Sequence, residues 1–399
     1  MKKLLAFLLV LILCFCSVLP AFAEGEKTPL KVLAIGHSYA VNSTEYIWSI
    51  ANGMGENIEI HTLYHAGCSI KRHVENYENG RLDYYLYKNG KTDFEYVDIK
   101  SVLKAEQYDV ITFQESPEGS VSFTSYKDDL GKLQSYVRKH QPNAQFMIHQ
   151  TWAFSVETLR GEGDYGAPGY GTSKEHFADI EDAYNSAAQF LGGVKIIKSG
   201  QAVELAKDAF NFGAAIKDNE SLYADTISHL SDIGKYLTAC VWVETLLGKD
   251  VRTSEFLLGV PRVEVLCEIA HETVTGEQST VFDGLRVLEN EKGYTLIKDY
   301  REIGADGVVE VPAYVNGKPI IALDDNVYKD VNGIKQMIIP RSIKSFNSGA
   351  YFGFNLKFVD AKKPPVPFYK SVWFYFALGG AVIMLGAVVL ILIKKRKDV

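Results

Sequence analysis

The stretch that decides the fold is LKVLAIGHSYA, residues 30–40. Its first six residues are almost continuously apolar, a pattern typical of a strand covered on both faces. A glycine follows, and then His37 and Ser38, so the serine comes just past the end of the strand. A serine on such a tight turn directs its hydroxyl into the crevice at the strands' carboxyl ends, which suits a nucleophile. Taken alone, the pattern is a weak signal, and it favours a turn serine that caps the following helix.

Short β-rich runs alternate with longer helical stretches over the first half of the chain. This alternation predicts an α/β domain with a five-stranded parallel sheet and helices on both faces. Ser231 stands at the N-cap position of one of the predicted helices. The predicted strands are 30–35, 57–63, 108–114, 144–150 and 194–198. The predicted helices are 43–54, 123–140, 173–191, 201–210, 232–248 and 263–273.

Two apolar segments predict export and membrane anchoring. Residues 1–23 combine a basic start, a short apolar run and small residues at the end, as a secretory signal peptide does. Residues 371–393 lack charge and proline, and at 1.5 Å per residue they span about 34 Å, enough to cross a bilayer. The basic tail, 394–399, is typical of the inner side. We therefore expect a single-pass cell-membrane protein whose N-terminal domain is extracellular.

Composition excludes several classes of protein. With 47% hydrophobic and 23% charged residues among 399, the chain is not disordered. Only Cys68, Cys240 and Cys267 lie outside the N-terminal apolar run, so neither a disulfide framework nor a paired-cysteine zinc site is expected. Without the two N-terminal lysines and residues 394–398, the 42 basic and 49 acidic residues fall to 36 and 48, a net charge of −12. Such a surface is a poor nucleic-acid binder, and we expect glycans or proteins as partners.

Further residues at predicted sheet-edge loops complement Ser38. Gly67 follows the second strand, Gln114 ends the third, and Asp225 and His229 lie just before the helix predicted at 232–248. Acyl transfer needs a nucleophile, a base to take its proton, and a carboxylate to orient the base. It also needs fixed donors for the developing oxyanion. All of these parts are present.

These residues fall in blocks that resemble the four motifs of the SGNH (GDSL-type) hydrolase superfamily, in the same order, over roughly residues 30–248. The sequence around these residues is similar to that of one bacterial subgroup of that superfamily. The segments that carry this similarity are KVLAIGHSYA, LYHAGCSIKRH, DVITFQESPEGS, HQTWAF and HLSDIGKYLTA.

The resemblance implies a flavodoxin-like sheet, no metal or other cofactor, and ester hydrolysis through a covalent acyl-enzyme. By the same resemblance, Ser38 would be the nucleophile, His229 the general base and Asp225 the acid that orients the imidazole. The backbone amides of Ser38 and Gly67, together with the side chain of Gln114, would form the oxyanion hole.

Three departures from the superfamily pattern bear on this assignment. His37 stands where Asp or Asn is usual, and Gln114 where the consensus has Asn. The spacing from Asp225 to His229 is four residues, one more than usual. The sequence therefore leaves open whether Asp225 completes a triad or whether the site works as a Ser–His dyad.

Other residues border the predicted crevice, and structural hydrogen bonding or packing is the alternative for each. The loop 153–172 contains five glycines and is interpreted as either a lid over a substrate groove or a plain surface excursion. The candidate substrate contacts are His37, His73, His149 and Trp152.

The C-terminal part of the chain changes to short β runs. A strand ending in proline recurs at Pro312 and Pro340, and Tyr328 and Tyr351 are 23 residues apart. This segment resembles the bacterial surface-type leucine-rich repeat, which implies a packed spacer or a protein-binding surface. The expected order is signal peptide 1–23, hydrolase-like domain 28–275, linker 276–293, repeat segment 294–360, juxtamembrane tether 361–370, membrane span 371–393 and cytoplasmic tail 394–399.

The function expected from these features is that of a membrane-anchored extracellular serine esterase. Its expected substrate is an acylated, for example acetylated, carbohydrate or another small ester. The rival hypothesis is a non-catalytic surface module that binds a glycan or a protein on a hydrolase fold. A lipase or thioesterase is a third alternative.

Overall fold

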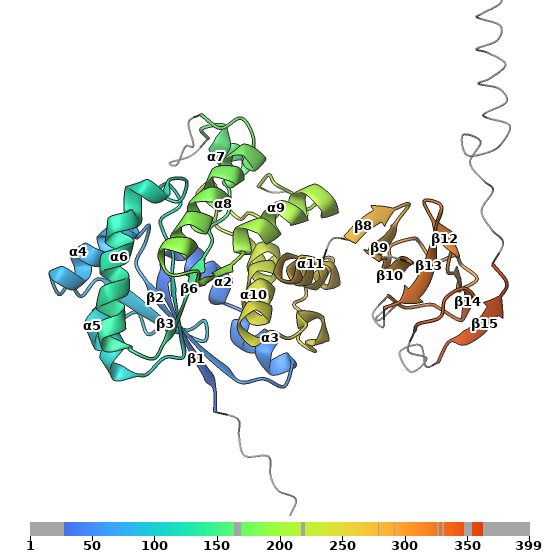
Figure 1. Ribbon diagram of the computed structural model, residues 1–399, viewed down its shortest axis with the longest axis horizontal. Coiled ribbons are helices and arrows are strands. Elements are labelled where there is room, and N and C mark those ends of the chain that lie inside the picture. The colour runs from blue at the N-terminus through green and yellow to red at the C-terminus, as the bar shows by residue number, and fades with distance from the viewer. Residues whose placement is uncertain are drawn as a thin grey trace, which may run out of the picture. The chain divides into compact units, whose positions relative to one another are not determined.

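The computed structural model describes residues 28–162, 169–216, 220–277, 279–290, 292–324, 327–328, 331–346 and 353–361. It divides into two compact units, one ending at Gly276 and one starting at Glu277 (Figure 1). The predicted signal peptide, the membrane span 371–393, the tail and nearly all of the tether lie outside the described residues. Within those residues, no helix combines the length and apolar character that crossing a membrane requires.

The first unit is built on a seven-stranded sheet with the order β4-β3-β2-β1-β5-β6-β7. The five predicted strands are confirmed, and they pair in parallel. They are β1 (Leu30–Gly36), β2 (Ile58–Tyr64), β5 (Val110–Phe113), β6 (Gln145–His149) and β7 (Lys195–Ile197). The predicted number of strands, five, was too small. Two further strands, β3 (Tyr84–Lys88) and β4 (Tyr96–Val97), continue the sheet beyond β2 in antiparallel fashion.

Helices cover both faces of this sheet, as Figure 1 shows. The alternation along β1 explains why: Val32 and Ala34 belong to one core, and Leu33 and Ile35 to the other. The first core is closed by α2 (Ser38–Thr44), α3 (Ile47–Gly53), α9 (Ser199–Phe210), α10 (Asp232–Leu247) and α11 (Val263–Thr275). The second is closed by α4 (Ile70–Glu78), α5 (Ile99–Ala105), α6 (Phe123–His140) and α8 (Ser173–Phe190).

Most predicted helices, including α6 and α8, are confirmed, with ends within two residues of those predicted. The predicted N-cap is also confirmed, since the Ser231 hydroxyl accepts from the Gly234 amide at the start of α10. The helix predicted at 43–54 was wrong at its start. Helix α2 already begins at Ser38, and the helical conformation is interrupted between α2 and α3. Helices α4 and α5 were not predicted. A short helix, α7 (Val156–Leu159), lies in the glycine-rich loop.

The second unit contains two small sheets. One has the order β12-β13-β10-β9-β8, and the other is a parallel ladder of β11, β14 and β15. The strands are β8 (Ser279–Phe282), β9 (Leu285–Asn290), β10 (Gly293–Asp299), β11 (Val308–Glu310), β12 (Tyr314–Val315), β13 (Lys318–Leu323), β14 (Gln336–Pro340) and β15 (Asn355–Val359).

The predicted linker 276–293 is not a connector along its length. Strands β8 and β9 pair with each other in antiparallel fashion, β9 pairs with β10, and Val287 is fully buried, so this segment belongs to the second unit's sheet. Pro340 ends β14, as expected from the sequence, whereas Pro312 lies two residues beyond the end of β11. Tyr351 lies outside the described residues, and the leucine-rich-repeat assignment stays a prediction.

Candidate active site

Ser38 lies at the turn between β1 and α2 and is half-buried. The turn requires glycine at position 36, because a Cβ there would lie 2.9 Å from Ala40 Cβ and 3.1 Å from Gln114 Oε1. Ser38 is the first residue of α2, so its backbone N–H has no partner within the helix.

His37 is fully buried and caps α2, since its Nδ1 accepts from the backbone N–H of Tyr39. The opposite ring nitrogen, Nε2, donates to the backbone carbonyl of Glu115 at 3.0 Å. These two bonds fix the neutral ring with its proton on Nε2, and burial lowers the pKa of His37 to about 4. The histidine thus performs the capping that Asp or Asn performs at helix starts.

Asp225 and His229 form a close pair despite their spacing. Asp225 Oδ2 lies 2.7 Å from Nδ1 of His229. The other carboxylate oxygen, Oδ1, accepts from the backbone N–H groups of Ile227 at 3.0 Å and His229 at 3.1 Å. The carboxylate therefore reaches the imidazole, as a triad requires. With its proton held at Nδ1, the ring keeps Nε2 as an acceptor.

Hydrogen bonds from Ser155 and Trp152 hold the loop that carries this pair. Ser228 has φ of +62°, and its hydroxyl accepts from the backbone N–H of Ser155 at 2.9 Å. Trp152 Nε1 donates to the Ser228 carbonyl at 2.9 Å. The Trp152 ring also stacks on Tyr39 of α2, with centroids 4.0 Å apart. Trp152 is fully buried, so it joins the histidine loop to the serine helix and is not exposed to substrate.

Ser38, Gly67 and His229 line a common cavity of about 140 Å³. Ser38 and His229 also line a second cavity of about 260 Å³ with Tyr64 and Tyr87. The structure thus brings together the predicted nucleophile, base and oxyanion glycine. Within the described residues, no hydrogen bond joins the Ser38 hydroxyl to the His229 ring. Such bonds are often loose in an enzyme without substrate.

The predicted oxyanion hole includes two backbone donors, Ser38 and Gly67, that both line the smaller cavity. Gly67 adopts φ of +57°, is exposed, and has no atom within 4 Å of where a Cβ would be, so the loop leaves room for a substrate. In the part of the chain that the structure describes, the backbone N–H groups of Ser38 and Gly67 have no acceptor. Both groups are therefore available to a ligand oxygen.

Gln114 does not line either cavity. It is 1% exposed, and its Nε2 lies 2.7 Å from Nδ1 of His149, whose Nε2 contacts the Ser199 hydroxyl at 3.0 Å. One amide N–H is therefore used by His149, and the second is the one that could serve an oxyanion. Burial lowers the pKa of His149 well below its usual value. His149 is an interior residue that positions Gln114 and does not reach substrate.

His73 is also an interior residue. Its ring stacks on Tyr84, and Nδ1 lies 2.9 Å from the Tyr84 hydroxyl and 3.5 Å from Cys68 Sγ. Burial lowers the pKa of His73 to about 3. Of the four candidate substrate contacts, only His37 lies around the cavity, and its side chain has no exposed surface.

Sequence reasoning missed Glu115, which connects three of the four motifs. Its carboxylate accepts from the backbone N–H of Ile70 at 3.1 Å, near the Gly67 loop, and from that of Ser116 at 2.7 Å. Its carbonyl accepts from His37, as described above. Burial raises the pKa of the Glu115 carboxyl. The only sequence signal was its position directly after Gln114.

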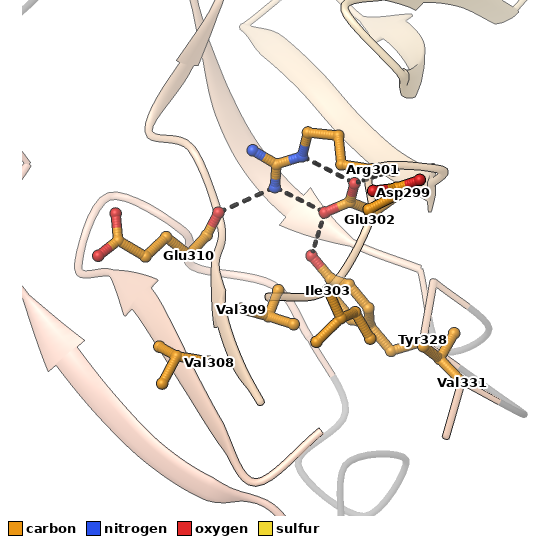
Figure 2. A pocket seen from close by; sticks show the side chains of 9 residues that line it. All are labelled: Asp299, Arg301, Glu302, Ile303, Val308, Val309, Glu310, Tyr328 and Val331. Carbon is orange, nitrogen blue, oxygen red and sulfur yellow. Dashed lines mark hydrogen bonds and ion pairs between the residues drawn. The ribbon is translucent and has the colours of Figure 1, made fainter. Parts of the chain in front are cut away.

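A cavity of about 240 Å³ in the second unit lacks catalytic parts (Figure 2). The Asp299 carboxylate accepts from Arg301 Nε at 2.8 Å, Arg301 Nη2 at 2.6 Å and the Tyr328 hydroxyl at 2.8 Å. Arg301 also donates to the Glu310 carbonyl at 2.9 Å. Asp299 and Arg301 satisfy one another, and among the described residues no serine, cysteine or histidine lines this cavity.

Two clusters in the described residues have potential metal-ligand atoms within 4.8 Å of one another. In each cluster, one carboxylate already pairs with a basic side chain of the protein. Lys31 pairs with Glu106 at 2.5 Å, and Arg252 pairs with Asp250 at 2.7 Å. We therefore assign them a structural role. The clusters are Glu59, His61 and Glu106, and Glu244, Asp250 and His271.

Residues 31–262 match the family model DUF4886, described as a domain of unknown function. The chain belongs to the DUF4886 family. The match covers most of the first unit, including every residue of the candidate site.

Solved structures similar to this DUF4886 protein include a DUF4886 family protein from Bacteroides uniformis, with 28% identity and a TM-score of 0.54, covering 62% of this chain and 95% of that chain. A Slackia heliotrinireducens protein assigned to the SGNH hydrolases has 19% identity and a TM-score of 0.37, covering 55% and 100%. A Clostridium thermocellum family 3 carbohydrate esterase has 14% identity and a TM-score of 0.33, covering 54% and 94%. Among curated proteins, none matches this chain.

Proposed function

We propose that this DUF4886 protein is a serine esterase of the SGNH type that removes acetyl or other short acyl groups from a carbohydrate. One observation carries the proposal: Ser38, Gly67 and His229 line one cavity, and Asp225 lies 2.7 Å from Nδ1 of His229.

In the proposed reaction, Ser38 Oγ attacks the ester carbonyl carbon while His229 Nε2 takes the hydroxyl proton. Asp225 holds the proton on Nδ1 and stabilises the imidazolium that forms. The oxyanion accepts from the backbone N–H groups of Ser38 and Gly67, with the Gln114 amide as a third donor. His229 then protonates the leaving alcohol, and water hydrolyses the acyl-enzyme by the same route.

The cavity walls support a small and uncharged ester. The two cavities that Ser38 and His229 line have volumes of about 140 Å³ and 260 Å³, each below the several hundred Å³ of pockets for larger ligands. The cation that lines the larger cavity, Lys235, already pairs with Glu45 at 2.9 Å and Asp232 at 3.6 Å. A carboxylate or phosphate would find no unpaired cation among the described lining residues.

The test is covalent labelling of the full-length protein in detergent with a fluorophosphonate probe. The wild type should be labelled, Ser38→Ala should not, and Ser125→Ala, an exposed serine on α6, should behave as wild type. Equal labelling of wild type and Ser38→Ala would remove Ser38 from the mechanism.

Ester hydrolysis separates the remaining alternatives. We expect release of p-nitrophenol from the acetate ester, with rates falling as the acyl chain lengthens. A preference for octanoate would favour a lipase or thioesterase. No turnover of p-nitrophenyl acetate or of acetylated sugars by folded protein would favour the non-catalytic binding module.

The location of the enzyme is part of the proposal. Residues 1–23 and 371–393 support export and a single membrane anchor, with the segment 294–360 as a packed spacer or protein-binding surface. Deletion of residues 371–399 should release the protein from the membrane fraction into the medium. Retention of that variant in the cytoplasm would contradict the assignment.

A further inference from the structure

Three tyrosines form a row across the edge of the first unit's sheet. Tyr64 of β2 is the register partner of Tyr85 of β3, and Tyr85 is the register partner of Tyr96 of β4. Direct partners in neighbouring strands point to the same face. The ring centroids lie 6.4 Å and 4.6 Å apart, and the ring planes differ by only 18° and 22°. The three rings therefore lie one after another across the strands, with similarly oriented faces.

Two further aromatic rings flank this row. Tyr87 lies two residues after Tyr85 on the same strand and so shares its face, and its ring meets Tyr64 edge-on at 5.8 Å. Phe94 meets Tyr85 edge-on, also at 5.8 Å. Phe94 is 69% exposed and Tyr96 58% exposed. We call these five residues, Tyr64, Tyr85, Tyr87, Phe94 and Tyr96, the aromatic strip.

The aromatic strip is continuous with the candidate active site. Tyr64 lines both cavities that contain Ser38 and His229, and Tyr87 lines the larger of them. The strip then crosses two strand spacings, about 10 Å, to the edge strand β4. A molecule held on the strip therefore reaches the cavity without leaving the protein surface.

We infer that the aromatic strip binds the sugar rings of an uncharged polysaccharide whose acyl group enters the Ser38 cavity. This inference rests on the proposed esterase function and extends it from a small ester to a polymeric substrate. Exposed aromatic faces pack on the C–H faces of sugar rings, and tyrosine hydroxyls can bond sugar hydroxyls. The strip itself carries no charge, which matches the paired state of Lys235 at the cavity.

The geometry favours a polymer chain over a folded protein as the occupant. A stable protein interface buries about 800 Å² on each partner, which is more than one narrow row of five side chains presents. A protein seated on the strip would also cover the cavity at Tyr64, whereas an extended chain can pass along the strip and present one acyl group at a time.

The experiment compares polymer with small ester. For Tyr96→Ala and Phe94→Ala in the full-length protein, kcat/KM on acetylated xylan and acetylated mannan is divided by kcat/KM on p-nitrophenyl acetate. We expect this ratio to fall about three- to tenfold for each ring removed, mainly through KM. The matched control is Tyr77→Ala, which removes a ring stacked at 3.9 Å on Tyr136, on α4 and α6. That ratio should remain at the wild-type value.

Binding without catalysis separates this inference from the proposed function. Retardation of Ser38→Ala in gels containing unacetylated xylan or mannan should be reduced when Tyr96→Ala is added, with an apparent Kd about three- to tenfold higher. Failure to hydrolyse p-nitrophenyl acetate would contradict the esterase alone, since this binding needs no turnover. The inference is overturned if neither polymer retards the protein, if the strip variants match their parent, or if Tyr77→Ala has the same effect.

Discussion

Asp225 Oδ2 lies 2.7 Å from Nδ1 of His229, although the two residues are separated by one position more than is usual for this pair. Ser228, which lies between the two residues, takes the left-handed conformation, with φ of +62°. The loop then folds around the carboxylate, whose other oxygen accepts from the backbone of Ile227 and His229. The longer spacing is therefore compatible with a complete triad.

Asp225→Asn tests whether the acid is needed. The amide cannot stabilise the imidazolium, and it favours the wrong tautomer, so kcat should fall about 10²- to 10⁴-fold with little change in KM. Steady-state hydrolysis of p-nitrophenyl acetate measures this effect. The control is Asp129→Asn on α6, whose carboxylate pairs with Lys132 at 2.9 Å, and it should have wild-type activity. Activity of Asp225→Asn within a factor of about two of wild type would indicate a Ser–His dyad.

Ser228 is expected to contribute to stability through both its backbone and its hydroxyl. Ser228→Ala and Ser228→Gly both remove the acceptor for the Ser155 N–H, which should cost about 1–3 kcal/mol of unfolding free energy. Glycine avoids the left-handed strain that alanine keeps, so it should be up to about 1 kcal/mol more stable than alanine. Urea unfolding measures both differences. Equal stability of Ser228→Ala and wild type would show that the hydroxyl is dispensable.

The central strands could be predicted from the sequence because helices cover both of their faces, which leaves continuous apolar runs such as residues 30–35. Strands β3 and β4 could not, since they form a half-exposed edge in which aromatic residues occupy the open face. The short β8, STVF, mixes polar and apolar residues and shows its strand character only through pairing with β9.

Ser38, Gly67 and His229, which line the cavity, could be predicted because each follows a predicted strand or precedes a predicted helix. Their supports could not, because these contacts join distant parts of the chain: His37 and Glu115 are 78 residues apart, and Trp152 and Ser228 are 76 apart. The interior position of His149 could not be predicted for the same reason. A position at a strand end suggested exposure to substrate, whereas its partner, 35 residues earlier, places it in the interior.

Glu115→Gln should weaken the connection between the serine turn and the glycine loop. A glutamine amide nitrogen cannot accept a hydrogen bond, so one of the backbone N–H groups of Ile70 and Ser116 loses its buried partner. We expect a loss of about 1–3 kcal/mol in unfolding free energy and a lower kcat. Glu118→Gln, on the exposed cavity wall, is the matched control and should retain wild-type stability. Identical stability of both variants would rule out this role for Glu115.

Buried His37 makes stability depend on pH. Its folded pKa is about 4, and its pKa in the unfolded chain is near 6.5, so between these values the unfolded state binds the additional proton. Stability is therefore complete above pH 6.5 and falls as the pH decreases toward 4. Asn at position 37 keeps a helix-capping side chain but does not titrate, so His37→Asn removes this one contribution.

The measurement is urea unfolding of wild type and His37→Asn at pH 7 and pH 5. The shift of one histidine corresponds to about 2 kcal/mol at pH 5, so the stability of wild type relative to His37→Asn should decrease by about that amount. The buried His73 and His149 titrate in both proteins; burial is the larger cause of their lowered pKa and the charge of His37 a smaller one, so the larger part of their contributions cancels in the difference. The same difference at both pH values would show that His37 is not held neutral by its burial.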